Sequence, residues 1–413
     1  MPVLHDYQQR IVNEAPDKWG FWLSCGLGKS AICISLMEKN LPHDSIIIIT
    51  TKSLKENWKN EVKKWSKKNE YSFIIRSKEE FRRDYKTLPR VNGLIIDEAH
   101  FVGNFKSQIH KALLQYIKVR HPRFIYLATA TPIMSEVWSV WSLSKILGKE
   151  VLPFWKFKQK YFIEIKMGNR RIPVQKKGIE EQIASDLRSF GTVLHTKDVL
   201  GPEDVIHETE YFKQNKEQER AVMDIDEDPT SINHMTYYTK CLQIASGTLK
   251  LDDKGGFKTI PCDKLERVKE LVEQYPNICI VAKHTAELRM LQDNLKGSFI
   301  YDGHTKEEER QRIIDQINTK GGVLLLQADS GVGFNLEKVN LIVFYSHTFD
   351  FIKYSQCLGR NGGLRQKGRN TYLHLITSDT IDEDVWECLE RKTSFDISLY
   401  NRKKNENNSN SNK

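Results

Sequence analysis

The segment Phe21–Ser30 has the sequence FWLSCGLGKS: an apolar run ends at Leu23, a glycine-rich turn follows, and a helical pattern then extends from Ala31 to Asn40. The order strand, glycine-rich turn and helix is typical of a phosphate-binding loop. Backbone N–H groups at a helix N-terminus, a lysine ammonium and a hydroxyl can all act on phosphate and Mg²⁺. The longer pattern G-x-x-x-x-G-K-[ST] fails at Leu23, whereas G-x-G-K-S is complete. A purely structural glycine turn is the alternative for this segment taken alone.

The alternation of short apolar runs with helical stretches predicts the fold class. Each apolar run is bounded by turn or polar residues, as is typical of buried strands in a parallel sheet. Helical stretches such as 54–67 and 306–318 separate the runs, which favours an α/β protein with doubly wound parallel sheets. Trp58 and Trp65 lie seven residues apart in the first of these helices and are interpreted as packing residues. The expected strands are 21–23, 46–50, 93–96 and 124–127 in a first lobe, and 278–282, 298–301, 323–327, 341–345 and 372–376 in a second.

The same pattern divides the chain into two lobes and a segment between them. A length of 413 residues suggests two or three domains, at roughly 100–200 residues each. We expect an N-terminal lobe at 1–148, a mostly helical insertion and linker at 149–259, and a C-terminal lobe at 260–400. The tail 401–413, NRKKNENNSNSNK, has no apolar residue and is predicted to be disordered.

The composition is that of a soluble protein with a weak basic excess. Hydrophobic residues make up 39% of the chain and charged residues 28%, and no apolar run approaches the roughly 18 residues needed to span a bilayer. No secretory signal is visible, and the seven cysteines are scattered without a C-x-x-C pair, so disulfides and a zinc ribbon are not expected. We therefore expect a cytoplasmic, intracellular protein without a membrane partner. The net charge of +9 permits a polyanionic partner without requiring one.

A second functional segment, Asp97-Glu98-Ala99-His100, directly follows the apolar run 93–96. Two carboxylates at a strand tip suit a Mg²⁺ ligand beside a base that orients water. Two surface acids would be the simpler interpretation of this segment alone, but the phosphate-binding loop upstream favours the functional one. Arg360 and Arg365, which follow Gln356, are candidate arginine fingers for a phosphoryl group. A basic surface helix is the equally weighted alternative for these arginines.

Taken in order, these segments resemble the Swi/Snf-type DNA translocases of helicase superfamily two, and the likeness covers nearly the whole chain. In that family a glutamine that reads adenine precedes the phosphate loop, a DEAH box supplies the acids, and further motifs follow in both lobes. The matching segments are LHDYQ at 4–8, GLGKS at 26–30, TTKSL at 50–54, DEAH at 97–100, LATATP at 127–132, YDG at 301–303, GVGFNL at 331–336 and Q-x-x-x-R at 356–360.

Two motifs depart from the family's pattern. The last motif of the family reads Q-x-x-x-R-x-x-R, but its second arginine falls at Gly363, so Arg365 fits only with a two-residue insertion. Gln327 and Ala328 stand where the family has threonine and arginine. Arg360 is therefore the better match for a γ-phosphate contact, and Arg365 is the weaker one.

The resemblance implies two RecA-like lobes with ATP and Mg²⁺ bound between them. It assigns the nucleotide to Gln8, Gly26, Leu27, Gly28, Lys29, Ser30 and Gly333, the metal to Ser30 and Asp97, and catalysis to Lys29, Asp97, Glu98, Arg360 and Arg365. It also implies DNA as the partner, with duplex favoured and contacts largely independent of base sequence. The residues expected to contact DNA are Thr51, Lys52, Ser53, Thr131, Lys283, His284 and Gly331, each of which has a solvated surface group as its alternative.

Three functions follow as hypotheses. The first is an ATP-hydrolysing motor that translocates on double-stranded DNA. The second is a helicase that separates DNA or RNA strands, which is less favoured because no added wedge domain is apparent in the sequence. The third is an ATP-gated DNA-binding module with little turnover, which the altered last motif suggests.

Overall fold

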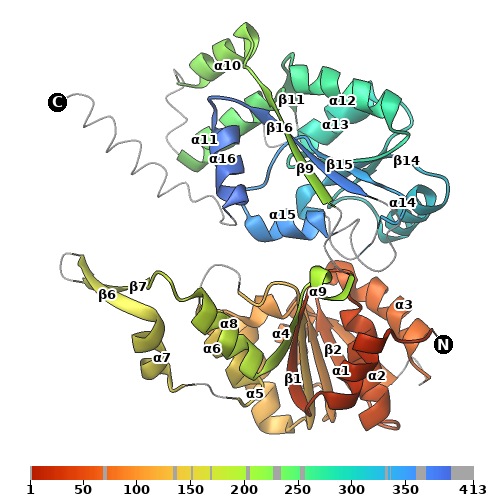
Figure 1. Cartoon of the computed structure of the whole chain (residues 1–413), viewed down its shortest axis with the longest axis vertical. Coiled ribbons are helices and arrows are strands. Elements are labelled where there is room, and N and C mark those ends of the chain that lie inside the picture. The colour runs from red at the N-terminus through yellow and green to blue at the C-terminus, as the bar shows by residue number, and fades with distance from the viewer. Residues whose placement is uncertain are drawn as a thin grey trace. The chain divides into compact units, whose positions relative to one another are not determined.

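The computed structural model describes residues 2–67, 72–133, 137–149, 152–167, 170–200, 205–226, 234–251, 256–330, 334, 336–359 and 369–391. The chain forms two compact units, residues 1–203 and 204–413 (Figure 1). The tail 401–413, predicted to be disordered, lies outside the described residues. None of the helices in the described part of the chain combines the length and the apolar character needed to cross a bilayer.

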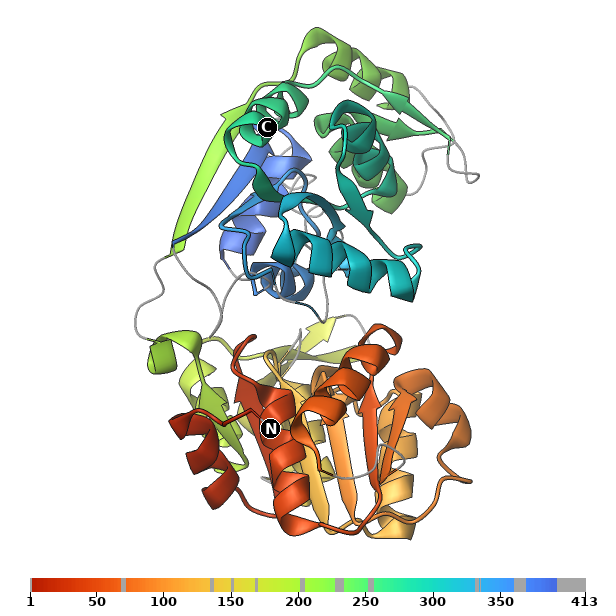
Figure 2. The ribbon, with the colours of Figure 1, turned by 90° about the vertical axis from the view of Figure 1, so that its right-hand side faces the viewer.

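Unit 1 is built on a six-stranded sheet in the order β3-β2-β4-β5-β1-β8, in which every neighbouring pair runs parallel. Helices cover both sides of this sheet (Figures 1 and 2). All five residues of β2, four of them isoleucine, are buried, because a central parallel strand is covered on both faces. The strands are β1 (Lys18–Leu23), β2 (Ile46–Thr50), β3 (Phe73–Ser77), β4 (Gly93–Asp97), β5 (Phe124–Thr129) and β8 (Gly191–Leu194). The helices of this unit include α1 (Asp6–Glu14), α2 (Lys29–Asn40), α3 (Lys55–Trp65), α4 (Lys78–Asp84), α5 (Gln108–Arg120), α6 (Trp138–Ile146) and α8 (Glu180–Ser189).

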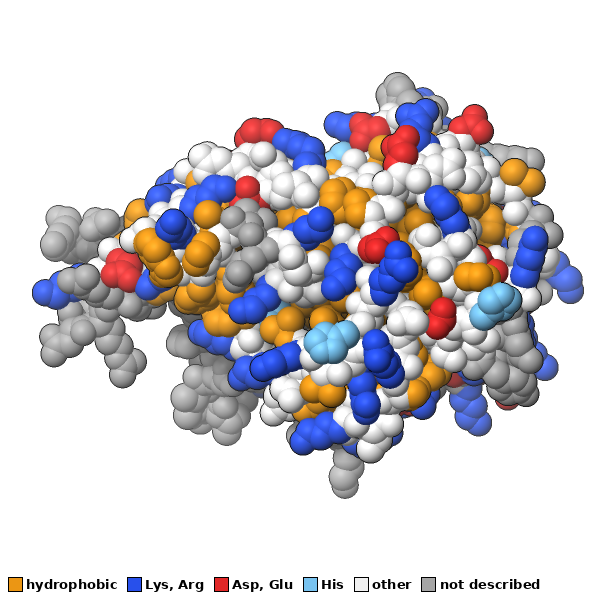
Figure 3. All heavy atoms as spheres, turned by 90° about the horizontal axis from the view of Figure 1, so that it is seen from below, with side chains coloured by type: hydrophobic (Ala, Val, Ile, Leu, Met, Phe, Trp, Pro, Cys, Tyr) orange, Lys and Arg blue, Asp and Glu red, His pale blue; other side chains and the backbone are white. Residues whose placement is uncertain are grey.

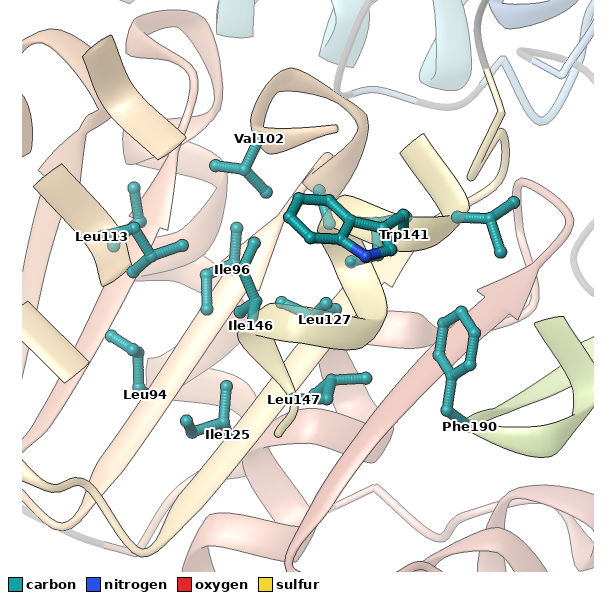
Figure 4. Close-up of a cluster of buried hydrophobic side chains, with 14 of the residues drawn as sticks. Leu94, Ile96, Val102, Leu113, Ile125, Leu127, Trp141, Ile146, Leu147 and Phe190 are labelled. Atoms are coloured by element: carbon teal, nitrogen blue, oxygen red, sulfur yellow. The ribbon is translucent and has the colours of Figure 1, made fainter. Parts of the chain in front are cut away.

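One large apolar core of unit 1 lies between the sheet and helices α4, α5, α6 and α8. Alternate residues of the strands, such as Ile96 and Leu127, point into this core (Figure 4). Trp141 of α6 and Phe190, which directly follows α8, close it from the helical side. The core fixes the strands in place, and the ends of these strands carry the functional segments.

Unit 2 contains a second six-stranded sheet, in the order β13-β14-β12-β15-β16-β9, which is again parallel throughout. The predicted α/β class, with two doubly wound parallel sheets, is confirmed. The strands are β9 (Val205–Phe212), β12 (Asn277–Ala282), β13 (Phe299–Tyr301), β14 (Gly322–Gln327), β15 (Leu341–Phe344) and β16 (Asn370–Thr377), with a small hairpin of β10 (Thr248–Lys250) and β11 (Phe257–Thr259). The helices include α10 (Lys216–Asp226), α11 (His234–Ala245), α12 (Asp263–Gln274), α13 (Thr285–Asn294), α14 (Glu307–Thr319), α15 (Phe351–Leu358) and α16 (Ile381–Glu390).

The division between the units differs from the expected one, since residues 149–259 do not form a separate helical insertion. The first part of this segment belongs to unit 1, where β8 is the edge strand beside β1, and the rest belongs to unit 2, where β9 is the edge strand beside β16. Unit 1 also includes α7 (Phe154–Tyr161) and an antiparallel hairpin of β6 (Phe162–Met167) and β7 (Arg170–Gln175). Edge strands are partly exposed, so they lack the continuous apolar runs by which buried parallel strands are recognised.

Candidate functional site

The carboxyl ends of four parallel strands meet at one edge of the sheet in unit 1, and the predicted functional segments follow these ends. The loop 24–28 follows β1, Thr51 follows β2, Asp97 ends β4, and Thr131 comes two residues after β5. Open α/β sheets bind ligands at this edge. Segments that are far apart in the sequence therefore come together as a candidate site.

The phosphate loop requires glycine at two positions. Gly26 has φ of 78° and Gly28 has φ of 71°, both in the left-handed region that other residues avoid. Gly28 is also the N-cap residue of α2, and a Cβ atom on it would lie 2.2 Å from Nε2 of Gln8. The loop therefore has the backbone conformation that a phosphate cradle needs, and Gly28 leaves room for the Gln8 amide.

Lys29 and Ser30 are the first two residues of α2. Nζ of Lys29 donates to the carbonyl oxygens of Leu23, at 3.0 Å, and Ser24, at 3.2 Å. The ammonium group is thus held over the loop by weak neutral acceptors, which a phosphate can replace with charge-assisted bonds.

Gln8 is almost fully buried and contacts this loop directly. Its Nε2 donates to the carbonyl oxygen of Leu27 at 3.2 Å, and the hydroxyl of Tyr7 donates to the same oxygen at 2.9 Å. Burial raises the pKa of Tyr7 to about 12, so this hydroxyl keeps its proton and stays a donor at neutral pH. The structure thus brings Gln8 to the loop, while its contact with adenine stays a prediction.

Asp97 is buried at the end of β4 and accepts two hydrogen bonds on Oδ2. The hydroxyl of Thr50 donates at 3.2 Å, and Nε1 of Trp58 donates at 2.7 Å. Burial and the neighbouring charge of Glu98 raise the pKa of Asp97 to about 6. A cation placed at this carboxylate would relieve both of these unfavourable effects.

Glu98 and His100 contact each other next to Asp97. Glu98 adopts a left-handed backbone conformation, with φ of 50°, and its Oε2 lies 3.1 Å from Nδ1 of His100. The same Nδ1 lies 3.4 Å from Oγ1 of Thr129, which accepts a bond from the backbone N–H of Thr131 at 3.1 Å. The DEAH segment is therefore connected through His100 to the chain that follows β5.

Trp58 is a site residue that the sequence analysis missed. Its interpretation as a packing residue is incomplete, because its buried indole also donates to Asp97. The contact depends on the pairing of β2 with β4, which brings the start of α3 next to the end of β4. Only knowledge of the strand order could have revealed it.

The donor set of unit 1 fits Mg²⁺. No group of three or more His, Cys, Asp or Glu in the described residues could hold a metal by itself. Mg²⁺ is commonly held by one or two carboxylates together with substrate phosphates and water, however. The Asp97 carboxylate, the Ser30 hydroxyl and the adjacent phosphate cradle match that pattern.

The residues expected to contact DNA divide between the units. In unit 1, Lys52 and Ser53 are exposed at the start of a 3-10 turn, Lys52–Leu54, and Oγ1 of Thr51 lies 3.2 Å from Oγ of Ser53. Together with Thr131 they occupy the same sheet edge as the loop. This arrangement offers hydroxyl, amide and ammonium donors of the kind that contact phosphates.

In unit 2, Lys283 and His284 follow β12 and precede α13. The backbone N–H of Lys283 donates to Oγ of Ser346 at 2.8 Å, and its ammonium lies over the ring of Phe349. Burial and the nearby Lys283 charge lower the pKa of His284 to about 3, so that imidazole is neutral. Gly331, Gly333, Arg360 and Arg365 lie outside the described residues.

Two family models match the chain: the SNF2-related domain matches residues 67–210, and the helicase conserved C-terminal domain matches residues 263–364. Together they account for more than half of the sequence. The chain belongs to the SNF2-related, helicase-like family. The resemblance inferred from the motifs is therefore confirmed.

Individual relatives are distant. The mouse "SWI/SNF-related matrix-associated actin-dependent regulator of chromatin subfamily A member 1" is 22% identical over 90% of this chain and 40% of its own length. An "Uncharacterized ATP-dependent helicase" of Mycoplasma pneumoniae is 24% identical over 94% of this chain and 41% of its own length. This SNF2-related chain thus spans about two fifths of the length of these relatives. Among solved structures, the "Sulfolobus solfataricus SWI2/SNF2 ATPase core in complex with dsDNA" is 19% identical, covering 96% of this chain and 92% of that chain, with a TM-score of 0.44.

Proposed function

We propose that this chain hydrolyses ATP, with Mg²⁺, to translocate along double-stranded DNA. The observation that carries the proposal is the meeting of three elements at one sheet edge: the glycine loop with Lys29, the buried Asp97, and Glu98 held by His100. Membership of the SNF2-related family supports ATP as the nucleotide and DNA as the partner. We propose the DNA duplex, rather than a single strand, as the track.

Lys29 and the loop hold the phosphates in this proposal. The ammonium leaves the carbonyl oxygens of Leu23 and Ser24 and turns to the phosphates, while N–H groups at the start of α2 donate to them. The Ser30 hydroxyl and the Asp97 carboxylate would hold Mg²⁺. When bound, the ion supplies neutralisation of the charge that develops on the phosphates.

Glu98 is proposed as the base that orients the attacking water. Its contact with His100 fixes the carboxylate, which lets it accept a proton from water in one defined direction. Because His100 also contacts Thr129, we infer that a shift of Glu98 during hydrolysis is transmitted to segment 129–131. Thr131 of this segment is one of the residues that the resemblance assigns to DNA contact, so we propose that His100 couples hydrolysis to DNA contact.

The second lobe is proposed to complete the site. The family resemblance implies that ATP is bound between the lobes and that Arg360 reaches the γ-phosphate, with Arg365 as the second candidate. An arginine supplied in this way stabilises charge on the transferring phosphoryl group. Hydrolysis would then be tied to closure of the two lobes around the nucleotide, which is a hinge motion about a ligand.

Steady-state ATP hydrolysis tests the proposal, measured without nucleic acid and with duplex DNA, single-stranded DNA or RNA. We expect duplex DNA to stimulate turnover most, and we expect Lys29→Ala and Glu98→Gln to reduce it by about 10²-fold or more. Lys118→Ala, which changes an exposed lysine of α5, is the matched control. Substantial turnover in both site variants contradicts the proposal. Stimulation by single strands or RNA alone favours a strand-separating helicase instead.

The altered last motif favours a second candidate, the ATP-gated DNA-binding module with little turnover. Gly363 stands where the family has its second arginine, and an enzyme without that arginine loses stabilisation of the transition state rather than of bound ATP. This candidate predicts tight, ATP-dependent binding to DNA with slow hydrolysis even at saturating DNA. The same hydrolysis series separates the two functions.

A further inference from the structure

The hairpin of β6 and β7 has one apolar face. The strands are antiparallel and form a sheet of their own, in which Ile163 is paired with Val174 and Ile165 with Ile172. Side chains alternate along a strand and paired residues share a face, so Ile163, Ile165 and Val174 lie on one side of the hairpin. In Figure 1 the hairpin extends away from the six-stranded sheet of unit 1.

This apolar face is exposed. Ile163 is 48% exposed, Ile165 is 43% and Val174 is 40%, whereas all five residues of the interior strand β2 of the same unit are buried. The base of the hairpin is anchored instead: Phe162 is buried and stacks on Trp138 with ring centroids 4.1 Å apart. A hairpin with a fixed base and an uncovered apolar face is suited to contact something outside the chain.

The segment that contains the hairpin is basic in sequence, although Lys158 pairs with Glu164 and Lys160 pairs with Asp186 of α8. Residues 152–177 contain eight lysines or arginines and one acid, Glu164, although the whole chain has a net charge of only +9. Lys156 and Lys166 are exposed, and Trp155, at 58% exposure, lies under the Lys156 ammonium at 5.4 Å. Figure 3 shows hydrophobic and basic side chains next to one another at the left of the view, the side on which Figure 1 draws the hairpin.

The apolar face and the basic segment together favour a binding partner that carries many negative charges and also exposes apolar surfaces. Lysines bind phosphates and release counterions, aromatic rings stack on bases, and aliphatic wedges unstack neighbouring base pairs. A second copy of this face is a poor partner, because a symmetric contact would bring two basic surfaces together. The charge therefore favours nucleic acid over self-association.

We propose that the β6–β7 hairpin binds DNA at the point where a duplex opens, with its lysines on the phosphates and its apolar face against unstacked bases. This goes beyond the duplex motor proposed above, since it gives the chain an element for separating strands. The projecting hairpin of unit 1 would then act as the wedge that is not apparent in the sequence.

The test uses the full chain and DNA forks that carry 2-aminopurine at the junction, without nucleotide. We expect the wild type to bind the fork more tightly than blunt duplex and to raise the 2-aminopurine fluorescence. In the double variant Ile163→Asn, Ile165→Asn the fluorescence rise should disappear, and ATP-driven strand displacement should fall by about 10-fold or more, as expected when a wedge is lost. Duplex-stimulated ATP hydrolysis should stay within about twofold of wild type, since the hairpin is outside the nucleotide site.

Two further variants complete the design. In Lys156→Gln, Lys166→Gln the affinity for the fork should fall, and the slope of log K against log salt should decrease by about one for each lysine removed. Val119→Asn, which changes an exposed valine of α5 elsewhere in unit 1, should behave as wild type.

Three results would overturn the proposal. The first is an unchanged fluorescence rise and strand displacement in both hairpin variants. The second is loss, in those variants, of binding to anionic lipid vesicles with fork binding retained. The third is a change from dimer to monomer in the apolar variant, again with fork binding retained. If DNA fails to stimulate hydrolysis but the junction signals behave as expected, the duplex motor falls and the hairpin proposal stands.

Discussion

At the scale of single residues, Asp97 depends on a donor that lies in another element. The indole N–H of Trp58 donates to its Oδ2 at 2.7 Å, which favours the charged carboxylate against the effect of burial. Trp58→Phe keeps most of the ring volume and removes this donor, so we expect the pKa of Asp97 to rise further. Hydrogen bonds to charged groups are worth about 1.5–3 kcal/mol, so Mg²⁺–ATP affinity at neutral pH should fall by about 10-fold. Titration with a fluorescent ATP analogue measures it, with Trp65→Phe as the control, and equal affinity in Trp58→Phe contradicts the assignment.

Glu287 in α13 predicts a pH dependence of stability. It is fully buried, its Oε2 accepts bonds from the Ser346 hydroxyl and the His284 N–H, and burial raises its pKa to about 7. The folded state therefore binds this proton more tightly than the unfolded state does. Stability relative to Glu287→Gln should be retained below about pH 4.5 and lost as pH rises through about 7.

The size of this effect follows from about 1.4 kcal/mol per pKa unit, which gives about 2–3 kcal/mol between pH 4.5 and 8. Urea unfolding across that range measures it. Glu308→Gln, on the exposed surface of α14, should leave the pH profile unchanged. A pH profile that is identical for wild type and Glu287→Gln would show that Glu287 is ionised throughout.

At the scale of elements, the edge strand β8 depends on a glycine. A Cβ atom on Gly191 would lie 2.1 Å from Nε1 of Trp22, the atom that donates to the carbonyl oxygen of Leu187 at 3.1 Å. Gly191→Val should displace the indole and loosen β8 from β1, at the cost of about 1–3 kcal/mol that is typical of overpacking. Thermal unfolding and hydrogen exchange of residues 191–194 measure the effect, and Thr192→Ser is the neighbouring control. Unchanged protection of β8 in Gly191→Val would contradict it.

Elements also show what sequence can and cannot predict. β2, β4, β12 and β14 were predictable because each is an apolar run buried on both sides, and the phosphate loop and the DEAH segment because each is local. β9 was not predictable, because exposed residues such as Glu208 interrupt its apolar pattern. Its hydrogen-bonding partners are in β16, which lies far along the chain. The contacts of Trp58 with Asp97 and of His100 with Thr129 likewise depend on strand order, which no local pattern contains.

At the scale of the whole molecule, the two compact units have apolar clusters of their own, which predicts two unfolding transitions. In unit 2 the fully buried Lys264 donates to Asp382 at 2.5 Å. Lys264→Met leaves that carboxylate buried without its cation, which typically costs about 3–5 kcal/mol. Calorimetry of Lys264→Met should show the transition of unit 2 at a lower temperature than in wild type. Added ATP should raise the temperature of the transition of unit 1. Lys269→Met, which breaks an exposed pair with Glu266, should change little. A single transition that both changes shift would contradict the independence of the units.

The connection between the units has a mechanical consequence. β8 ends at Leu194 and β9 begins at Val205, so residues 195–204 tether the edge strand of one sheet to the edge strand of the other. A load on this connection reaches each sheet at the end of an edge strand, where the backbone pairs of that strand carry it. β8 is paired with β1 over four residues and β9 with β16 over eight. Under tension β8 should therefore separate from β1 before β9 separates from β16.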